Sequence, residues 1–229
     1  MSFGAMLTDA NGVPFYIADT MPLSLISRLS FSIPASSTYV QDLFPNDGAI
    51  RFVFANSTGS QGNGLSTCEA LMLNTTSNRW ELWCAGAART LNVFIFGYQY
   101  QPVPAWGIQI NDAQERCILT NETKVLRDVV NLGDSTNPDL SGYALNTTLN
   151  GQWAVAPVYT GYFSGVVYTG GGGNGQPHPI IAQYCSSARY NGSTTQISSG
   201  YIGNLEAQAS NASWVNYRNR ITAIDVSKY

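Results

Sequence analysis

Formal charge is scarce in this chain of 229 residues. Asp, Glu, Lys and Arg together make up 11% of it, whereas about 25% is usual in globular proteins. The net charge is −3 and no basic run occurs, so the sequence gives no electrostatic footprint for nucleic acid, and we expect no nucleic-acid partner. Hydrophobic residues still account for 44%, which excludes disorder by composition. A surface made of Ser, Thr, Asn, Gln, Gly and Tyr suits a chain that is packed in an assembly.

Long apolar runs are also missing. No stretch approaches the ~18 uninterrupted apolar residues of a transmembrane helix, so we expect no membrane span. The N-terminal segment MSFGAMLTDANG lacks the positive and apolar regions of a signal peptide, which predicts synthesis and folding in a cytoplasm. Cys68, Cys84, Cys117 and Cys185 show no CxxC or other metal-ligand spacing, and we expect reduced, partly buried thiols.

Catalytic side chains are sparse as well. His178 is the only histidine, and its flanking prolines predict an extended loop; it would ligate a metal only if three copies met on the axis of a trimer. The run from Gly170 to Gly175 precedes prolines instead of a helix, which argues against a phosphate loop and favours a loop tip. Asp9 and Asp112 lie at turns that their own side chains cap, and no carboxylate pair stands out as a glycosidase acid and base. We therefore expect no enzyme and no cofactor.

The pattern of apolar residues predicts strands. Helical periodicity is absent, and short apolar or alternating runs separated by Gly, Asn, Asp and Pro are typical of β-sandwiches and barrels. In the run 91–98 apolar residues occupy both faces, so we expect a strand that is buried on both sides. Further strands are expected at 25–33, 50–55, 67–73, 79–84, 125–132, 143–149, 152–158, 162–169, 180–190, 194–202 and 221–226.

The chain contains a repeat. The stretch WGIQINDAQERCILTNETKVL, from Trp106 to Leu126, aligns without gaps on FGAMLTDANGVPFYIADTMPL, from Phe3 to Leu23. The shared unit is an aromatic-Gly pair, a short alternating strand, an Asp turn and a second apolar strand. Self-similarity at a fixed offset indicates a duplication. The alternative, that two hairpins with an Asp turn are alike by chance, stays open.

The repeat sets the predicted domain organisation. We predict an all-β fold with two tandem β-sandwich domains related by internal duplication, at 1–101 and 106–229. Residues 102–105 form a linker between them, which two prolines keep extended and stiff. Both blocks close with an alternating strand that begins seven or eight positions after a Trp, which favours duplication of whole domains.

Aromatic residues are abundant, with five Trp, thirteen Tyr and nine Phe. Tyr and Trp are enriched at interfaces because they bury a large rigid area and keep a polar tip for a hydrogen bond. Tyr98, Tyr100 and Trp106 flank the linker. The candidates for a receptor-binding surface are four tyrosines around the glycine run, namely Tyr159, Tyr162, Tyr168 and Tyr190.

The opening FGAMLTDANGVPFYIAD resembles the start of small tail proteins of bacteriophages with long, non-contractile tails. Those proteins begin with a Gly-centred strand, an Asp-x-x-Gly turn and an aromatic strand; the second copy departs at the turn, where Glu115 replaces Gly12. The chain is thus similar to tail-tip or tail-fibre-associated minor tail proteins of siphovirus-like phages. The resemblance implies a non-enzymatic virion protein in the tail, a homotrimer, and contacts with other phage tail proteins and a host surface receptor.

Three functions follow from these observations. The first is a structural component of a phage tail tip or fibre, which assembles with other tail proteins and contributes to host attachment. The alternative is a receptor-binding module at the tail tip, which stacks Tyr and Trp on a glycan or binds a pilus. The third is an enzyme that degrades surface polysaccharide; it needs paired carboxylates in a cleft, to which no spacing in the sequence points.

Overall fold

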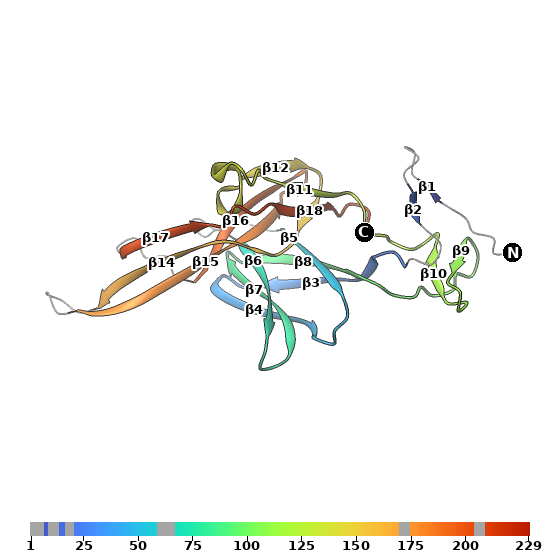
Figure 1. Cartoon of the computed structure of the whole chain (residues 1–229), viewed down its shortest axis with the longest axis horizontal. Helices are drawn as coiled ribbons and strands as arrows, with labels where there is room; N and C mark the ends of the chain where they lie inside the picture. Colours follow the sequence, from blue (N-terminus) through green and yellow to red (C-terminus); the bar gives the residue numbers. More distant parts are fainter. Residues whose placement is uncertain (1–6, 9–13, 17–20, 59–66, 170–174, 204–208) are drawn as a thin grey trace.

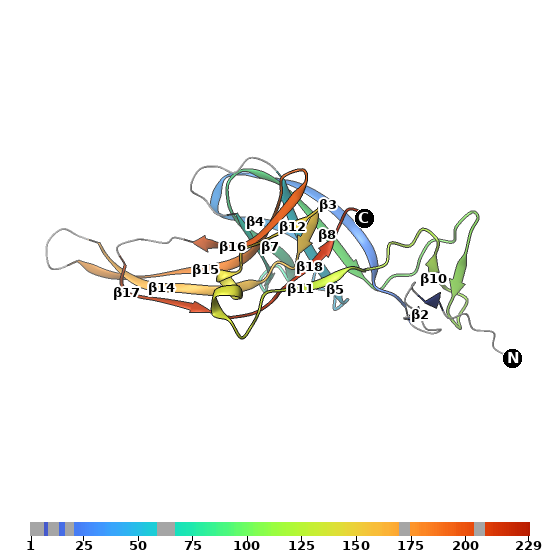
Figure 2. The ribbon, with the colours of Figure 1, turned by 90° about the horizontal axis from the view of Figure 1, so that it is seen from above.

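Strands make up almost all of the regular structure. The computed structural model describes residues 7–8, 14–16, 21–58, 67–169, 175–203 and 209–229. Within these ranges the helical elements are two short 3-10 helices, η1 (Pro138–Leu140) and η2 (Gly142–Ala144). The predicted all-β class is confirmed. Figures 1 and 2 show an elongated molecule, in which a body of packed sheets lies between a long arm of strands at one end and small hairpins at the other.

The described strands fall into two sets, before and after the predicted linker. The first set is β1 (Leu7–Thr8), β2 (Pro14–Tyr16), β3 (Ser24–Ile33), β4 (Ser36–Pro45), β5 (Arg51–Thr58), β6 (Cys68–Asn74), β7 (Arg79–Gly86) and β8 (Arg89–Gly97). The second set is β9 (Gln109–Asn111), β10 (Cys117–Thr120), β11 (Val129–Leu132), β12 (Thr147–Asn150), β13 (Trp153–Val155), β14 (Tyr159–Thr169), β15 (Gln176–Tyr190), β16 (Thr194–Gly203), β17 (Ser210–Asn216) and β18 (Ile221–Asp225). We call the two sets the first and second halves.

The antiparallel pairings of the first half recur in the second. In the first half β8 pairs with β3 and β5, and β7 pairs with β4 and β6. In the second half β18 pairs with β11 and β13, and β16 pairs with β12 and β15. Hairpin β1–β2 likewise corresponds to β9–β10. Every strand of the first half therefore has a counterpart with matching partners, which favours the predicted duplication of whole domains.

The two small hairpins also agree residue by residue. Their opposed residues are Leu7 with Tyr16 and Thr8 with Pro14 in one, and Ile110 with Leu119 and Asn111 with Cys117 in the other. These pairs are related by the offset that aligns Phe3 with Trp106, and in both hairpins the register shifts between the two pairs. The sequence repeat thus coincides with a repeated strand pairing.

Hydrogen bonds join the two halves into one sheet. Val155 of β13 lies opposite Ala55 of β5, and Arg189 of β15 lies opposite Ser57 of β5 in a parallel pairing. One path through the sheet is therefore β3-β8-β5-β13-β18-β11, with three strands from each half. Residues 102–105 separate the halves in sequence, but the proline segment is not what holds them together in space.

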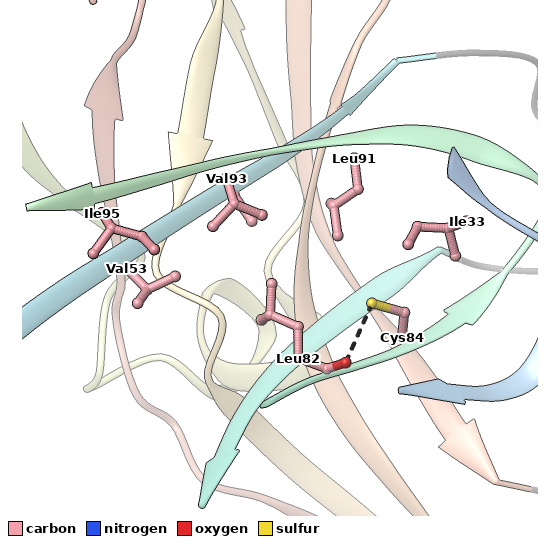
Figure 3. Close-up of a cluster of buried hydrophobic side chains, with 8 residues drawn as sticks. Ile33, Val53, Leu82, Cys84, Leu91, Val93 and Ile95 are labelled. Carbon is pink, nitrogen blue, oxygen red and sulfur yellow. Dashed lines mark hydrogen bonds between the residues drawn. The ribbon is translucent and has the colours of Figure 1, made fainter. Parts of the chain in front are cut away.

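The first half forms a sandwich, with β3, β8 and β5 on one side and β4, β7 and β6 on the other (Figure 3). Leu91, Val93 and Ile95 are two residues apart in β8, so their side chains face the same way. They pack with Leu82 and Cys84 of β7, and none of the five is more than 4% exposed. The corresponding core of the second half consists of Leu145, Val155, Ala188, Ile197, Ile221 and Ala223.

The other face of β8 is buried too, as the sequence predicted. Phe94 and Phe96 are 0% exposed and pack with Phe54 of β5. The same cluster contains Ala154 of β13 and Ile224 of β18, so this core takes its side chains from both halves. A strand that is buried on both faces needs apolar residues at successive positions, which explains the unbroken run VFIF at 93–96.

A second contact between the halves, which we call the seam, brings β6 and the end of β5 against β15. Hydroxyl groups bridge it: Thr67 Oγ1 lies 3.2 Å from Ser187 Oγ, and Ser57 Oγ donates a hydrogen bond to the Ala188 carbonyl at 3.2 Å. These four residues are at most 5% exposed. Buried hydroxyl groups need partners, and here each half supplies the partner of the other.

Candidate functional site

The second half carries strands that the first half lacks. Among the described strands, β14 and β17 are the two without a counterpart in the first half. β14 pairs with β15 on one side and with β17 on the other, and together they project from the body (Figures 1 and 2). We call β14, β17 and residues 176–184 the arm. Because insertions in one copy of a repeated unit often form its binding face, the arm is the candidate functional site. Most of the glycine run, residues 170–174, lies outside the described residues.

His178 lies in a strand, and the prediction of an extended loop there is wrong. It is part of β15, is exposed, and sits opposite Val167 of β14. Its neighbours Pro177 and Pro179 cannot donate backbone hydrogen bonds, which restricts them to places where a strand lacks one neighbour. β15 meets that condition here, because β16 pairs with it only from Ala182 onward. Proline therefore marks a sheet edge in this segment.

The arm carries no charged side chains. Residues 140–188 contain no Asp, Glu, Lys or Arg, and neither does β17. A partner of this surface would be held by apolar contact and by hydrogen bonds to amides and hydroxyls, since ion pairs are not available. The arm strands also supply no carboxylate, so they lack the acid and base pair that a glycosidase needs.

One face of the arm is aromatic. Phe163 of β14 is 1% exposed and lies opposite Trp214 of β17, with their ring centroids 5.0 Å apart. Trp214 is 54% exposed, so its ring packs on Phe163 and is also open to solvent. Closer to the body, the Tyr184 ring lies 4.9 Å from the Tyr143 ring and 6.2 Å from the Tyr201 ring. The rings therefore extend from the body along the arm.

Glycine at position 161 makes room for these rings. A Cβ at Gly161 would lie 2.6 Å from Cδ1 of Tyr143 and would also collide with the Val215 carbonyl oxygen. Any larger residue would displace Tyr143 or the neighbouring strand. The glycine at this position of β14 is thus required by packing.

The structure does not gather the four predicted tyrosines. Tyr162 and Tyr168 lie on one face of β14, the face opposite Phe163; Tyr168 is 54% exposed, and Tyr162 packs on Tyr217 with ring centroids 6.1 Å apart. Tyr159 lies at the base of the arm, where its hydroxyl donates to Sδ of Met72 at 2.7 Å. Burial raises the pKa of Tyr159 to about 12.

Tyr190 lies away from the arm. β15 is 15 residues long, and Tyr190 is its last residue. At the usual rise per residue of a strand, Tyr190 lies about 45 Å from Gln176, where β15 begins in the arm. There its hydroxyl donates to the Gly192 carbonyl at 2.6 Å. Sequence proximity to the glycine run was a poor guide, because a strand this long separates its two ends widely.

Sequence reasoning missed the most prominent ring of the arm, Trp214. The segment SNASWVN has no alternating apolar residues, so it gave no strand signal. Its strand character comes from pairing with β14, which local sequence does not report. A single Trp among small polar residues was the available signal of an exposed aromatic residue.

A second group of exposed apolar residues lies on the connection between β8 and β9, at the other end of the molecule (Figures 1 and 2). Trp106 is 81% exposed, Val103 68% and Ile108 66%. We call them, with Tyr98 and Tyr100, the linker surface. Scattered exposed apolar residues are ordinary, but five within such a short segment indicate a contact surface.

Among the residues that the structure describes, no group of three or more His, Cys, Asp or Glu side chains is placed to hold a metal ion. No described helix has the length and apolarity to cross a membrane.

No protein-family model matches the chain, and neither the curated proteins nor the solved structures contain a match.

Proposed function

We propose that this chain is a structural component of a bacteriophage tail tip or fibre, which assembles with other tail proteins as a homotrimer. The observation that supports this proposal is a pair of exposed aromatic-bearing surfaces at opposite ends of one hydrogen-bonded body: the uncharged arm and the linker surface. The resemblance of the opening FGAMLTDANGVPFYIAD supplies the phage context; of that stretch, residues 7–8 and 14–16 are described and form the first hairpin.

The proposed mechanism is geometric. The sheet that runs through both halves fixes the distance between the arm and the linker surface, so neighbours bound at each would be held at a set spacing. Burial of apolar area contributes about 25 cal/mol per Å² and needs no charge complementarity. A stable interface buries about 800 Å² per partner, which is why both surfaces need more than one exposed ring.

Two measurements test this proposal. Gold-labelled antibody against the purified chain should decorate one end of the tail in electron micrographs of the phage particle. Light scattering of the purified chain should give three times the chain mass of 24.7 kDa. Particles without label would overturn the tail assignment, and a monomer at micromolar concentration would overturn the trimer.

The alternative function, a receptor-binding module, is favoured by one observation. Trp214 is half exposed on a rigid aromatic support, in an arm without charge. A ring held in this way presents a flat apolar face at little entropic cost, which suits stacking on the C–H face of a neutral sugar.

Substitutions at the two surfaces distinguish the two functions. If the arm binds a neutral glycan, Trp214→Ala should weaken adsorption of the protein to host cells by 2 kcal/mol or more, about 30-fold in Kd. Trp106→Ala, at the other end, is the matched control and should leave adsorption unchanged while weakening assembly with tail proteins. Adsorption that is equal in wild type and Trp214→Ala would remove the receptor-binding function.

A further inference from the structure

Two cysteines meet at the seam. Cys68 of β6 and Cys185 of β15 are both 0% exposed and belong to one packed cluster with Ala70, Ala85 and Ile202. β6 and β15 are counterparts in the two halves, so each half contributes one thiol from the equivalent strand. The cluster is otherwise apolar and holds no other cysteine.

Burial and, after it, the neighbouring Cys185 thiol raise the pKa of Cys68, so the two thiols of this cluster are close enough to interact. The other two cysteines are directed elsewhere. Cys84 packs in the core of the first sandwich, with its Sγ 3.8 Å from the Leu82 carbonyl oxygen, and Cys117 belongs to the β9–β10 hairpin. Cys68 and Cys185 are thus the two cysteines that share a buried cluster, whereas Cys84 belongs to another.

We propose that Cys68 and Cys185 form a disulfide bond across the seam when the protein folds in the presence of a small-molecule disulfide such as oxidised glutathione. The Cys68 thiolate attacks one sulfur of the oxidant and releases one glutathione thiolate. The Cys185 thiolate then attacks the Cys68 sulfur, forms the S–S bond and releases the second. Two protein thiols are oxidised and one glutathione disulfide is reduced to two glutathione molecules.

The surroundings decide when this reaction occurs. Burial is the main cause that raises the pKa of Cys68, so in the folded protein the thiol stays protonated and reacts slowly. The bond is therefore made during folding or local opening of the seam. Once made, it would join the halves covalently where hydroxyl pairs and apolar contacts already hold them.

The test uses the full chain, refolded from denaturant in a reduced and in an oxidised glutathione buffer, so that burial does not limit access. After a second unfolding, N-ethylmaleimide labels the remaining thiols and the intact mass is measured. We expect four adducts from the reduced sample, one for each cysteine, and only the Cys84 and Cys117 adducts from the oxidised sample. Because the bond closes a long loop, the thermal midpoint should rise by about 10 °C or more, reversibly with dithiothreitol.

Variants complete the test. Cys117→Ser is the matched control and should keep the bond and the thermal shift. Cys185→Ala should lose both; if it fails to fold, Cys68→Ala provides the same comparison. Four adducts at every glutathione ratio, a glutathione adduct as the final product, or a bond that uses Cys84 or Cys117 would each overturn the proposal. None of these outcomes depends on the phage assignment.

Discussion

The buried ion pair between Glu69 and Arg89 allows a quantitative prediction. Arg89 donates from Nε and Nη2 to Oε1 of Glu69, at 3.0 and 2.7 Å. It also donates to the carbonyls of Ala87 at 3.0 Å and Cys68 at 3.3 Å. The two charged side chains are 1–2% exposed, and no hydrogen bond reaches Oε2 of Glu69 within the described part of the chain.

Replacing Arg89 by Met leaves the buried Glu69 carboxylate without its hydrogen-bonded cation, and Arg189 is then the cation that still stabilises its charge. Breaking a buried pair from one side costs about 3–5 kcal/mol of unfolding free energy, and Arg189 places the expected cost toward the lower end of that range. The double variant with Glu69→Leu removes both charges, so it should be more stable than Arg89→Met alone. The control is Arg79→Ala, which breaks an exposed pair with Asp42 and should cost no more than about 1 kcal/mol.

The same variant should show a characteristic pH dependence. Burial raises the pKa of Glu69, and the charge and hydrogen bonds of Arg89 oppose that rise. The folded state then holds this proton to higher pH than the unfolded chain, so stability falls as the pH rises from the unfolded pKa to the folded one. Without Arg89 the pKa of Glu69 rises further, and the loss of stability should be smaller at pH 5 than at pH 7.

Guanidinium unfolding followed by tryptophan fluorescence, at both pH values, measures these differences. Two results would refute the reasoning. One is a cost for Arg89→Met no larger than that for Arg79→Ala. The other is a double variant whose cost equals the sum of the two single ones, since a coupled pair cannot be additive.

Three more predictions follow from packing and burial. Phe96→Ala should lower the unfolding free energy by about 3–5 kcal/mol, measured by denaturant titration, because its 0% exposed ring fills the core that both halves share. Gly161→Val should cost about 1–3 kcal/mol or more, seen as a lower thermal midpoint, since a Cβ there meets Tyr143 and the Val215 carbonyl; a cost near zero would contradict the close approach. Absorbance at 295 nm should show a tyrosine ionising at a pKa of about 12 that Tyr159→Phe removes, and this residue's contribution to stability should be lost as the pH rises above 10.

Local patterns in the sequence predicted most of the strands, but not β4 or β17. The alternation in 91–98 gave a strand and its two buried faces, and the repeat gave both small hairpins with the correct offset. These signals work because a strand that faces a core must place apolar residues at fixed intervals. The predicted strand at 143–149 is wrong in its first part, where η2 occupies residues 142–144 and β12 begins only at Thr147.

Pairings between strands that are far apart in the chain left no such signal in the sequence. The contact of Val155 with Ala55 joins the halves, yet neither residue differs from an ordinary core residue in the sequence. The candidate site was only partly predicted for a similar reason. Tyr162 and Tyr168 lie on the arm, but Trp214 joins them through a strand whose own sequence is polar. Exposure and pairing are properties of the assembled sheet, and composition alone does not report them.

The contacts of Tyr229 have a consequence during synthesis. Its ring packs on Phe96 at 5.0 Å, its carbonyl accepts from Arg28 at 3.1 Å, and its hydroxyl bonds the backbone of Val125 and Arg127. A ribosome adds roughly 5–20 residues per second. The aromatic face around Phe96 is therefore synthesised on the order of ten seconds before Tyr229, which covers it. During that interval the nascent chain exposes an aromatic, aggregation-prone surface. A chaperone that binds exposed aromatic segments would bind the chain at this surface.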